Sequence, residues 1–383
     1  MLPDYITDCL NTLYEHNINA YLVGGCVRDM LLCTAPDDYD ITTDASPRTI
    51  CEIFPRVIKT GIKHGTVTVM YDRHPIEITQ MRTEGEYSDF RRPDFVVPCD
   101  DINADLRRRD FTVNAMAMDK DMNIVDLFCG QDDLKSGIIR AVGNPQKRFT
   151  EDALRIMRAF RFSAKLGFSI EENTLKSALE LSGNLKYVSA ERVFTELQKT
   201  LMSQNPQNIS PLINCGGLSP FFINECSDLS KISKLPKSIL PRFAMFLLLT
   251  NADVLVCDKL KVPNKLKKFA VGCIENIECT DTDTDFKRII SKIGRDFATE
   301  FFRVYFLYHN KDFNENRIKS ILQSPCTIAD LAVNGNDLKS LGIEGENIKK
   351  VLSKLLCTVY ENTAENDRER LITLAKHLKG ELK

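Results

Sequence analysis

The chain has 383 residues, 43% of them hydrophobic and 27% charged, with a formal net charge of −2 at pH 7. These values exclude a disordered chain, a collagen-like repeat and a small disulfide scaffold, and the length predicts two to four packed modules. Residues 1–10 contain acids where a signal or transit peptide would have bases, and the longest apolar run, 243–249, is too short to span a bilayer. We therefore expect a cytoplasmic protein with no membrane partner.

Thirteen cysteines and five histidines are scattered along the chain. No two cysteines form a Cys-x-x-Cys pair, and the histidines lie too far apart to complete a zinc site. We expect reduced, mostly buried thiols and no structural zinc.

Charge is divided unevenly along the chain. Residues 1–136 carry about ten more acids than bases, whereas residues 137–383 carry an excess of about eight bases. An acidic metal-binding module beside a basic one suits an enzyme that grips a phosphate backbone with one part and performs chemistry with another. A solvated surface of uneven charge explains the same numbers equally well.

Strand and helix patterns occupy different parts of the chain. Short apolar runs typical of strands, separated by glycine, proline and short helical stretches, occur at 20–23, 39–41, 66–70 and 76–78. From about residue 149 onward the apolar residues recur with helical periodicity. We predict an α+β fold, in which a small mixed or antiparallel sheet with helices in residues 1–136 is followed by helical modules at 137–200, 201–277 and 278–383.

Gly24 and Gly25 follow the first predicted strand, and a helix is predicted at 27–32. Two glycines allow a phosphate to approach the backbone closely, and the start of a helix favours anions. Turns of this kind are also common in a purely structural role. The pair becomes informative only together with the residues that follow it.

Asp38 and Asp40 stand two residues apart in a predicted strand. Their carboxylates should point to one face while Tyr39 and Ile41 face the core, and a cation such as Mg²⁺ would relieve the repulsion between them. An isolated Asp-x-Asp is more often a surface turn, but the preceding glycine pair favours a metal site. Glu77 is the best candidate for the third carboxylate of a two-metal site. A solvent-facing polar residue on a half-buried strand is the alternative.

Two groups of arginines follow. Residues 107–109 are three consecutive arginines, which can clamp a triphosphate bidentately, although a basic helix start or a surface run explains them equally well. Further on, Asp152, Arg155 and Arg158 are three apart on a predicted helix and share one stripe, which Arg161 extends with a drift around the axis. Most such stripes are solvated salt bridges.

The order of these motifs resembles a known family. Gly-Gly-x-Val-Arg-Asp, Asp-x-Asp, Arg-Arg-Asp-Phe-Thr-x-Asn-Ala, Glu-Asp-x-x-Arg and residues 189–196 are similar to the motifs of class II tRNA nucleotidyltransferases, the CCA-adding enzymes, from about residue 20 to 200. The resemblance implies a polymerase-β-like catalytic head, a helical neck that selects the base, a body, and a tail that binds tRNA. It also implies Mg²⁺-dependent, template-independent addition of C, C and A to the tRNA 3′ end, with CTP and ATP as substrates.

The resemblance assigns roles to the residues at matching positions. Asp38 and Asp40 align with the metal ligands. Arg109 aligns with the triphosphate-binding arginine, and Asp152 with Arg155 aligns with the pair that reads the incoming base. The full set of implied nucleotide-binding residues is Gly25, Arg28, Arg109, Asp152, Arg155, Arg158 and Arg161.

The chemistry of the bases supports the base-reading role. Cytosine and adenine present an exocyclic amine donor beside a ring-nitrogen acceptor, whereas uracil and guanine present a carbonyl beside an N–H donor. An Asp acceptor next to an Arg donor therefore admits C and A, and a wrong base leaves buried polar groups unpaired at a cost of about 1–3 kcal/mol per group.

Two positions depart from the family pattern, because Cys33 and Cys129 stand where such enzymes usually have glycine. Both lie in turns away from the charged residues. We expect any effect to be on the local backbone and not on activity.

Several relatives remain as alternatives. Residues 82–93 resemble the flexible loop of full CCA-adding enzymes, which CC-only relatives lack, and the chain has no His-Asp dipeptide of an appended phosphohydrolase. A bacterial-type poly(A) polymerase or an A-adding relative keeps every motif, so the sequence separates it poorly. A catalytically silent RNA- or nucleotide-binding protein would be expected to lose a metal carboxylate, and none is lost.

Overall fold

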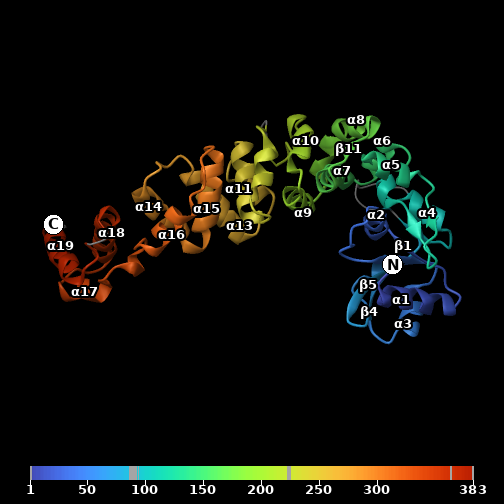
Figure 1. Ribbon diagram of the computed structural model, residues 1–383, viewed down its shortest axis with the longest axis horizontal. Coiled ribbons are helices and arrows are strands. Elements are labelled where there is room, and N and C mark those ends of the chain that lie inside the picture. The colour runs from blue at the N-terminus through green and yellow to red at the C-terminus, as the bar shows by residue number, and fades with distance from the viewer. Residues whose placement is uncertain (1, 86–92, 94, 222–225, 363–364, 382–383) are drawn as a thin grey trace. The chain divides into compact units, whose positions relative to one another are not determined.

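The computed structural model describes residues 2–85, 93, 95–221, 226–362 and 365–381. The chain divides into two compact units, Met1–Cys226 and Ser227–Lys383 (Figure 1). The sheet and its helices lie in the first unit together with a further helical region, and the second unit is helical in its described residues. The division into modules at 136, 200 and 277 stays a prediction.

A seven-stranded sheet forms the centre of the first unit, in the order β3-β4-β5-β2-β1-β8-β9. Neighbouring strands are antiparallel except β2 and β5, which run parallel, so the sheet is mixed. A separate antiparallel pair joins β6 and β7. The bounds are β1 (Ala20–Val23), β2 (Asp40–Thr43), β3 (Val57–Ile58), β4 (Thr66–Tyr71), β5 (His74–Gln80), β6 (Arg82–Glu84), β7 (Val96–Pro98), β8 (Ala117–Met118) and β9 (Ile124–Val125).

Five α-helices accompany this sheet: α1 (Asp4–Glu15), α2 (Gly25–Leu31), α3 (Pro47–Ile53), α4 (Ile102–Arg107) and α5 (Gly130–Ser136). Helix α1 packs along β1 and α3 along β4 (Figure 1). The 3₁₀ turns are η1 (Ile62–His64) and η2 (Thr112–Asn114).

Alternating burial explains why these segments form strands. Val67 and Val69 on β4 and Ile76 and Ile78 on β5 are at most 1% exposed, whereas Glu77 between the two isoleucines is exposed. A strand sends successive side chains to opposite faces, so one face of the pair enters the core and the other stays open to solvent. The open face is where the polar residues of β5 lie.

The remainder of the first unit is mostly helical, as expected. Its elements are α6 (Pro145–Glu151), α7 (Leu154–Leu166), α8 (Glu172–Glu180), η3 (Ser182–Tyr187), α9 (Ala190–Leu201), η4 (Pro206–Ile209) and α10 (Ser210–Asn214). One short parallel pair, β10 (Ile138–Ile139) with β11 (Ser169–Ile170), interrupts the helices. Two-residue strands leave no periodic signal in a sequence, which explains why the pair was not predicted.

The second unit packs helices around an apolar and aromatic core. Phe286, Phe301, Phe302 and Tyr305 are at most 2% exposed. No helix within the described residues is long and apolar enough to cross a membrane. The elements are η5 (Leu229–Lys234), α11 (Ile239–Leu249), α12 (Val256–Lys259), α13 (Asn264–Asn276), α14 (Asp283–Ile293), α15 (Arg295–Tyr308), α16 (Glu315–Gln323), η6 (Ile328–Asp330), α17 (Gly335–Ser340), α18 (Glu346–Glu361) and α19 (Arg368–Glu381).

Candidate active site

The register of two parallel strands places two carboxylates side by side. Asp40 is the first residue of β2, and its partner in the register on β5 is Glu77. The next pair, Ile41 with Ile78, is 1% exposed and faces the core. Because side chains alternate along a strand, Asp40 and Glu77 project from the opposite face of the sheet.

Asp38 lies just outside this strand. The prediction placed Asp38 and Asp40 in one strand, but β2 begins at Asp40, and Asp38 is exposed in the segment that leads into it. Burial, together with the charges of Asp38 and Glu77, raises the pKa of Asp40 to about 6 against the opposing charge of Arg109. Asp38 and Glu77 are therefore each close enough to repel Asp40, and Arg109 is close enough to offset part of that repulsion.

The donor set of this face suits a hard divalent cation. No three His, Cys, Asp or Glu side chains among the described residues gather closely enough to enclose an ion by themselves. Mg²⁺ is usually held by one or two carboxylates, with water and substrate phosphates as its other ligands. Asp40 with Asp38 fits that pattern, because the acids crowd together and lack an equal number of bases.

A glycine turn brings Arg109 to the edge of this face. Gly24 follows β1 with φ +75°, a left-handed conformation that favours glycine, and a Cβ there would stand 3.2 Å from Nη1 of Arg109. A Cβ on Gly25 would make only an ordinary contact, 3.6 Å from Nη2 of Arg28. The sequence pointed to Gly25, but Gly24 is the position where the absence of a side chain matters most for the backbone and for Arg109.

Arg28 is buried within the protein. Its side chain is 3% exposed, Nη1 donates to Oδ1 of Asn114 (2.6 Å), and Nε donates to Oδ1 of Asp29 (2.8 Å). The guanidinium also lies 5.4 Å from the centre of the Phe162 ring. These contacts tie α2 to η2 and α7, and the predicted nucleotide contact of Arg28 stays a prediction.

The arginine run, residues 107–109, begins at the last residue of α4, and a buried acid holds its second and third members. Asp105 accepts hydrogen bonds from Arg108 (2.8 and 3.0 Å) and from Arg109 (3.0 Å). Burial raises the pKa of Asp105, but the two guanidinium groups outweigh burial and hold that pKa below its usual value. Arg107 is exposed at the end of α4.

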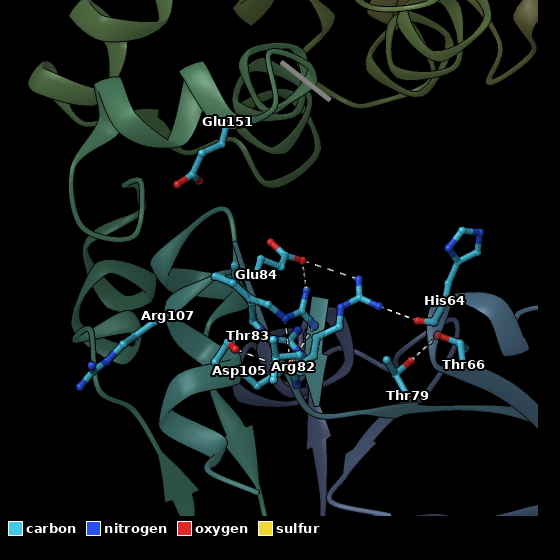
Figure 2. Close-up of polar contacts among 12 residues, drawn as sticks. His64, Thr66, Thr79, Arg82, Thr83, Glu84, Asp105, Arg107 and Glu151 are labelled. Carbon is cyan, nitrogen blue, oxygen red and sulfur yellow. Dashed lines mark hydrogen bonds and ion pairs between the residues drawn. The ribbon is translucent and has the colours of Figure 1, made fainter. Parts of the chain in front are cut away.

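A cleft of about 1000 Å³ lies beside the arginine run. Its wall includes Glu84 on β6, Arg107 at the end of α4, Arg108 directly after it, and Glu151 on α6. Figure 2 shows Glu84 beside Asp105 and Arg107 on one side and Glu151 reaching from its helix on the other. Arg108 pairs with Glu84 at 3.1 Å, and this ion pair connects β6 to the arginine run.

Asp152 is not on the helix where the sequence placed it. Helix α6 ends at Glu151 and α7 begins at Leu154, and Asp152 between them is extended, with φ −136° and ψ 103°. Its Oδ1 accepts from the backbone N–H of Leu154 (3.0 Å) and its Oδ2 from Nη2 of Arg192 (3.1 Å). The prediction of one continuous helix is therefore wrong here, because an Asp side chain competes for the first free N–H groups of a helix and favours a break.

Arg155 connects α7 to the arginine run. It is 9% exposed, and it donates to Glu151 (2.9 Å) and to the carbonyl of Arg108 (3.0 Å). Glu151 also holds Arg148 at 2.9 Å. Asp152 and Arg155 are close in the chain, but each has a separate side-chain partner.

The remaining arginines of α7 also pair with carboxylates from other elements. Arg158 contacts Asp110 at 2.6 Å, and Arg161 contacts Glu196 on α9 at 2.7 Å. Burial raises the pKa of Asp110, but Arg158 outweighs it and keeps that pKa below its usual value. Both guanidinium groups also lie over the ring of Phe162, at 5.3 and 4.1 Å. The stripe is thus a partly buried network between elements and not a solvated set of pairs along one helix.

The residues that sequence reasoning missed are the acids that hold these arginines: Asp105, Asp110, Glu151 and Glu196. A local signal existed for Asp105 and for Glu151, since each stands three or four residues from its arginines. The partners of Arg158 and Arg161 are distant in sequence, so only the fold reveals them.

A mixed sheet that presents crowded carboxylates beside a glycine turn and a fixed arginine defines the class of the protein as a nucleotidyltransferase. The family model described as poly A polymerase head domain matches residues 20–140. The model described as probable RNA and SrmB-binding site of polymerase A matches residues 167–224.

Full-length relatives identify the family. The chain is 35% identical to the CCA-adding enzyme of Enterococcus faecalis, across 98% of this chain and 97% of that one. It is 33% identical to the CCA-adding enzyme of Geobacillus sp., across 94% of each. The crystal structure of the Bacillus stearothermophilus CCA-adding enzyme in complex with CTP is similar with a TM-score of 0.84 and 28% identity, across 100% of this chain and 99% of that one. The chain belongs to the family of CCA-adding enzymes.

The resemblance inferred from the motifs is thereby confirmed, together with the α+β fold and the nucleotidyltransferase class. The roles of individual residues stay predictions.

Proposed function

We propose that this chain adds C, C and A to the 3′ end of tRNA without a nucleic-acid template, using CTP and ATP and releasing pyrophosphate. The observation that carries the proposal is the register of Asp40 with Glu77, beside Asp38 and within the influence of Arg109. The names of the full-length relatives and the CTP complex of a similar enzyme support the same substrates. A cytoplasmic location, expected from the sequence, is part of the proposal.

Asp38 and Asp40 would hold Mg²⁺, with Glu77 as the third carboxylate of the face. Two such ions, when bound, would activate the attacking 3′-hydroxyl and stabilise charge on the triphosphate. The protein's own contribution is to hold the acids close together against their repulsion, as the raised pKa of Asp40 reflects. The strand register supplies this arrangement before any substrate arrives.

Arg109 would bind the triphosphate. It stands beside the glycine turn, and its charge opposes the rise in the pKa of Asp40. A guanidinium there both balances the carboxylates and offers several donors to phosphate oxygens. We propose that Gly25 and Arg28 shape the turn on which the nucleotide rests.

Asp152 and Arg155 would select the base, with Arg158 and Arg161 continuing the binding surface. Asp152 has two protein donors on a carboxylate that has about four lone-pair positions, so it keeps acceptor capacity for an exocyclic amine. Arg155 donates to Glu151 and to the backbone carbonyl of Arg108, and these contacts fix the orientation of its guanidinium group. A rigid donor and acceptor pair rejects uracil and guanine by leaving polar groups unpaired.

One assay tests the proposal. Purified protein with Mg²⁺ is given a tRNA transcript that lacks CCA, with each nucleoside triphosphate separately and with all four together. We expect addition that halts after C, C and A. An unlimited A tail would identify a poly(A) polymerase, and absence of transfer with every nucleotide would identify a silent binding protein, so either result overturns the proposal.

A further inference from the structure

A fully buried carboxylate lies beneath two arginines of the arginine run. The side chain of Asp105 is 0% exposed; its Oδ1 accepts from Arg108 (2.8 and 3.0 Å) and its Oδ2 accepts from Arg109 (3.0 Å). The spacing of three and four residues across the end of α4 brings both guanidinium groups to the same acid. Each oxygen of Asp105 therefore accepts from the guanidinium of a different arginine, and Oδ1 also accepts from the backbone N–H of Arg82 (3.4 Å).

The two arginines differ in what else they contact. Arg108 also pairs with Glu84 on β6 (3.1 Å), and its carbonyl accepts from Arg155 (3.0 Å). Within the described residues, Asp105 is the one hydrogen-bond acceptor of the Arg109 side chain, and Nε of Arg109 is buried without a partner. Arg109 is thus fixed on one side and keeps unused donors on the other, beside Gly24.

We propose that Asp105 is a positioning residue for nucleotide binding, which holds Arg109 beside Gly24 with its remaining donors available to the triphosphate. The inference rests on the proposed role of Arg109 as the triphosphate ligand. Asp105 itself touches no substrate in this account, because its side chain is fully buried.

The physical reason is preorganisation. An arginine side chain has many rotamers, and one that must be ordered at the moment of binding lowers affinity. Asp105 orders Arg109 in advance through a charge-assisted hydrogen bond. Asp105 is itself held in place by Arg108, which also contacts Glu84 and Arg155. Loss of Asp105 should therefore weaken the binding of nucleoside triphosphate while the grip on tRNA is unchanged.

Steady-state kinetics of Asp105→Asn test this directly. Asn has nearly the same shape but no charge, and its NH₂ group would face one of the two guanidinium groups as a donor, so it cannot keep both charge-assisted contacts. We expect KM for CTP and for ATP to rise about tenfold or more, with KM for tRNA within about twofold of the wild type. Equal rises in all three KM values, or no rise in any, would overturn the proposal.

A matched variant separates positioning from stability. Ile102→Val changes a buried residue on the same helix, which belongs to an apolar cluster with Val23, Met81 and Leu106. The Ile102→Val variant should lower the thermal stability of the protein and leave KM for CTP unchanged. A rise in KM for CTP with Ile102→Val like that of Asp105→Asn would show that any disturbance of α4 has this effect, and would overturn the proposal.

A double-mutant cycle with Arg109→Ala tests the route of action. If Asp105 acts through Arg109, then Asp105→Asn should raise KM for CTP in the wild type but not in the Arg109→Ala background. Additive effects would overturn the proposal for Asp105 and leave the role of Arg109 intact. An unchanged KM for CTP in Arg109→Ala alone would instead refute the proposed role of Arg109.

Asp105→Asn leaves two guanidinium groups without their acid and can prevent folding. Asp105→Glu then serves, since it keeps the charge but moves the carboxylate by one methylene. We expect the same selective rise in KM for CTP. A folded Asp105→Glu protein with an unchanged KM for CTP would overturn the proposal.

Discussion

Acids lie in opposite electrostatic surroundings in two regions: the carboxylate face of the sheet, where Asp40 lies, and the arginine network of α4 and α7, which holds Asp105 and Asp110. Burial and the charges of Asp38 and Glu77 raise the pKa of Asp40 to about 6. Asp105 and Asp110 are more deeply buried, yet each has arginines against it and a pKa below the usual value. Burial raises the pKa of all three acids, so the charges of the neighbouring side chains decide whether the net shift is upward or downward. Acids outnumber bases in the first region, whereas the second contains its own counter-charges.

Replacement of an acid on the carboxylate face should have the largest effect on activity and the least on stability. We expect Asp40→Asn to lower kcat about a thousandfold or more, since several kcal/mol of transition-state stabilisation depend on bound ions. The melting temperature should stay the same or rise, because the variant removes repulsion among like charges. Single-turnover incorporation of CTP and thermal unfolding measure the two effects.

Asp37→Asn is the control for that variant, since Asp37 is an exposed neighbouring acid. It should leave kcat within about twofold of the wild type. An Asp40→Asn protein that transfers CTP at the wild-type rate would refute the assignment of this face.

Replacement of an acid in the arginine network should do the reverse. Asp110→Asn weakens the contact with Arg158, and we expect the free energy of unfolding of the first unit to fall by about 2 kcal/mol, reduced from the value for a fully buried pair because Arg158 is one third exposed. Denaturant unfolding measures this loss. A change below about 0.5 kcal/mol would show that the pair contributes little.

The same pair predicts a dependence on pH. Because the folded-state pKa of Asp110 is lowered, its contribution is complete above the unfolded-state pKa and is lost as the pH falls through the folded-state pKa. Stability of the wild type should therefore fall more steeply below about pH 4 than that of Asp110→Asn. Parallel curves for the two proteins would contradict the lowered pKa.

Changes at the base-selecting pair should alter specificity more than binding. We expect Asp152→Ala to reduce the preference for CTP over UTP about tenfold, measured as the ratio of kcat/KM values, with a smaller change in KM for CTP. Arg192→Gln is a useful comparison, because it removes the partner of Asp152 but leaves the carboxylate in place. Unchanged rejection of UTP and GTP in Asp152→Ala would count against the base-reading role.

The smallest expected effects are at the two cysteines that replace the usual glycines. Cys33 and Cys129 have φ of 55° and 56°, a left-handed conformation that costs a residue with a side chain about 1–2 kcal/mol. Cys33→Gly and Cys129→Gly should each raise the free energy of unfolding by about 0.5–1 kcal/mol, after the entropy cost of glycine, and leave kcat unchanged. Cys51→Gly, inside α3, should instead destabilise the protein by about 1 kcal/mol. Destabilisation by all three changes would contradict this account of the turns.

The sequence predicts best what depends on local periodicity. The strands that carry Asp40 and Glu77 follow from short apolar runs in the sequence, and the motif order identified the family. The break at Asp152 was missed because the side chain of one residue redirects the backbone there, against a helical pattern on both sides. The pairs of Arg158 with Asp110 and of Arg161 with Glu196 join distant segments, and no pattern in a single sequence indicates such pairs.

Binding of Mn²⁺, followed by electron paramagnetic resonance, tests the central claim that Asp38 and Asp40 hold the divalent ions. The wild type should bind Mn²⁺ in competition with Mg²⁺ at neutral pH. Asp38→Ala and Asp40→Ala should each lose that binding, while Asp37→Asn should retain it. Equal binding of Mn²⁺ by the wild type and by both alanine variants would contradict the claim.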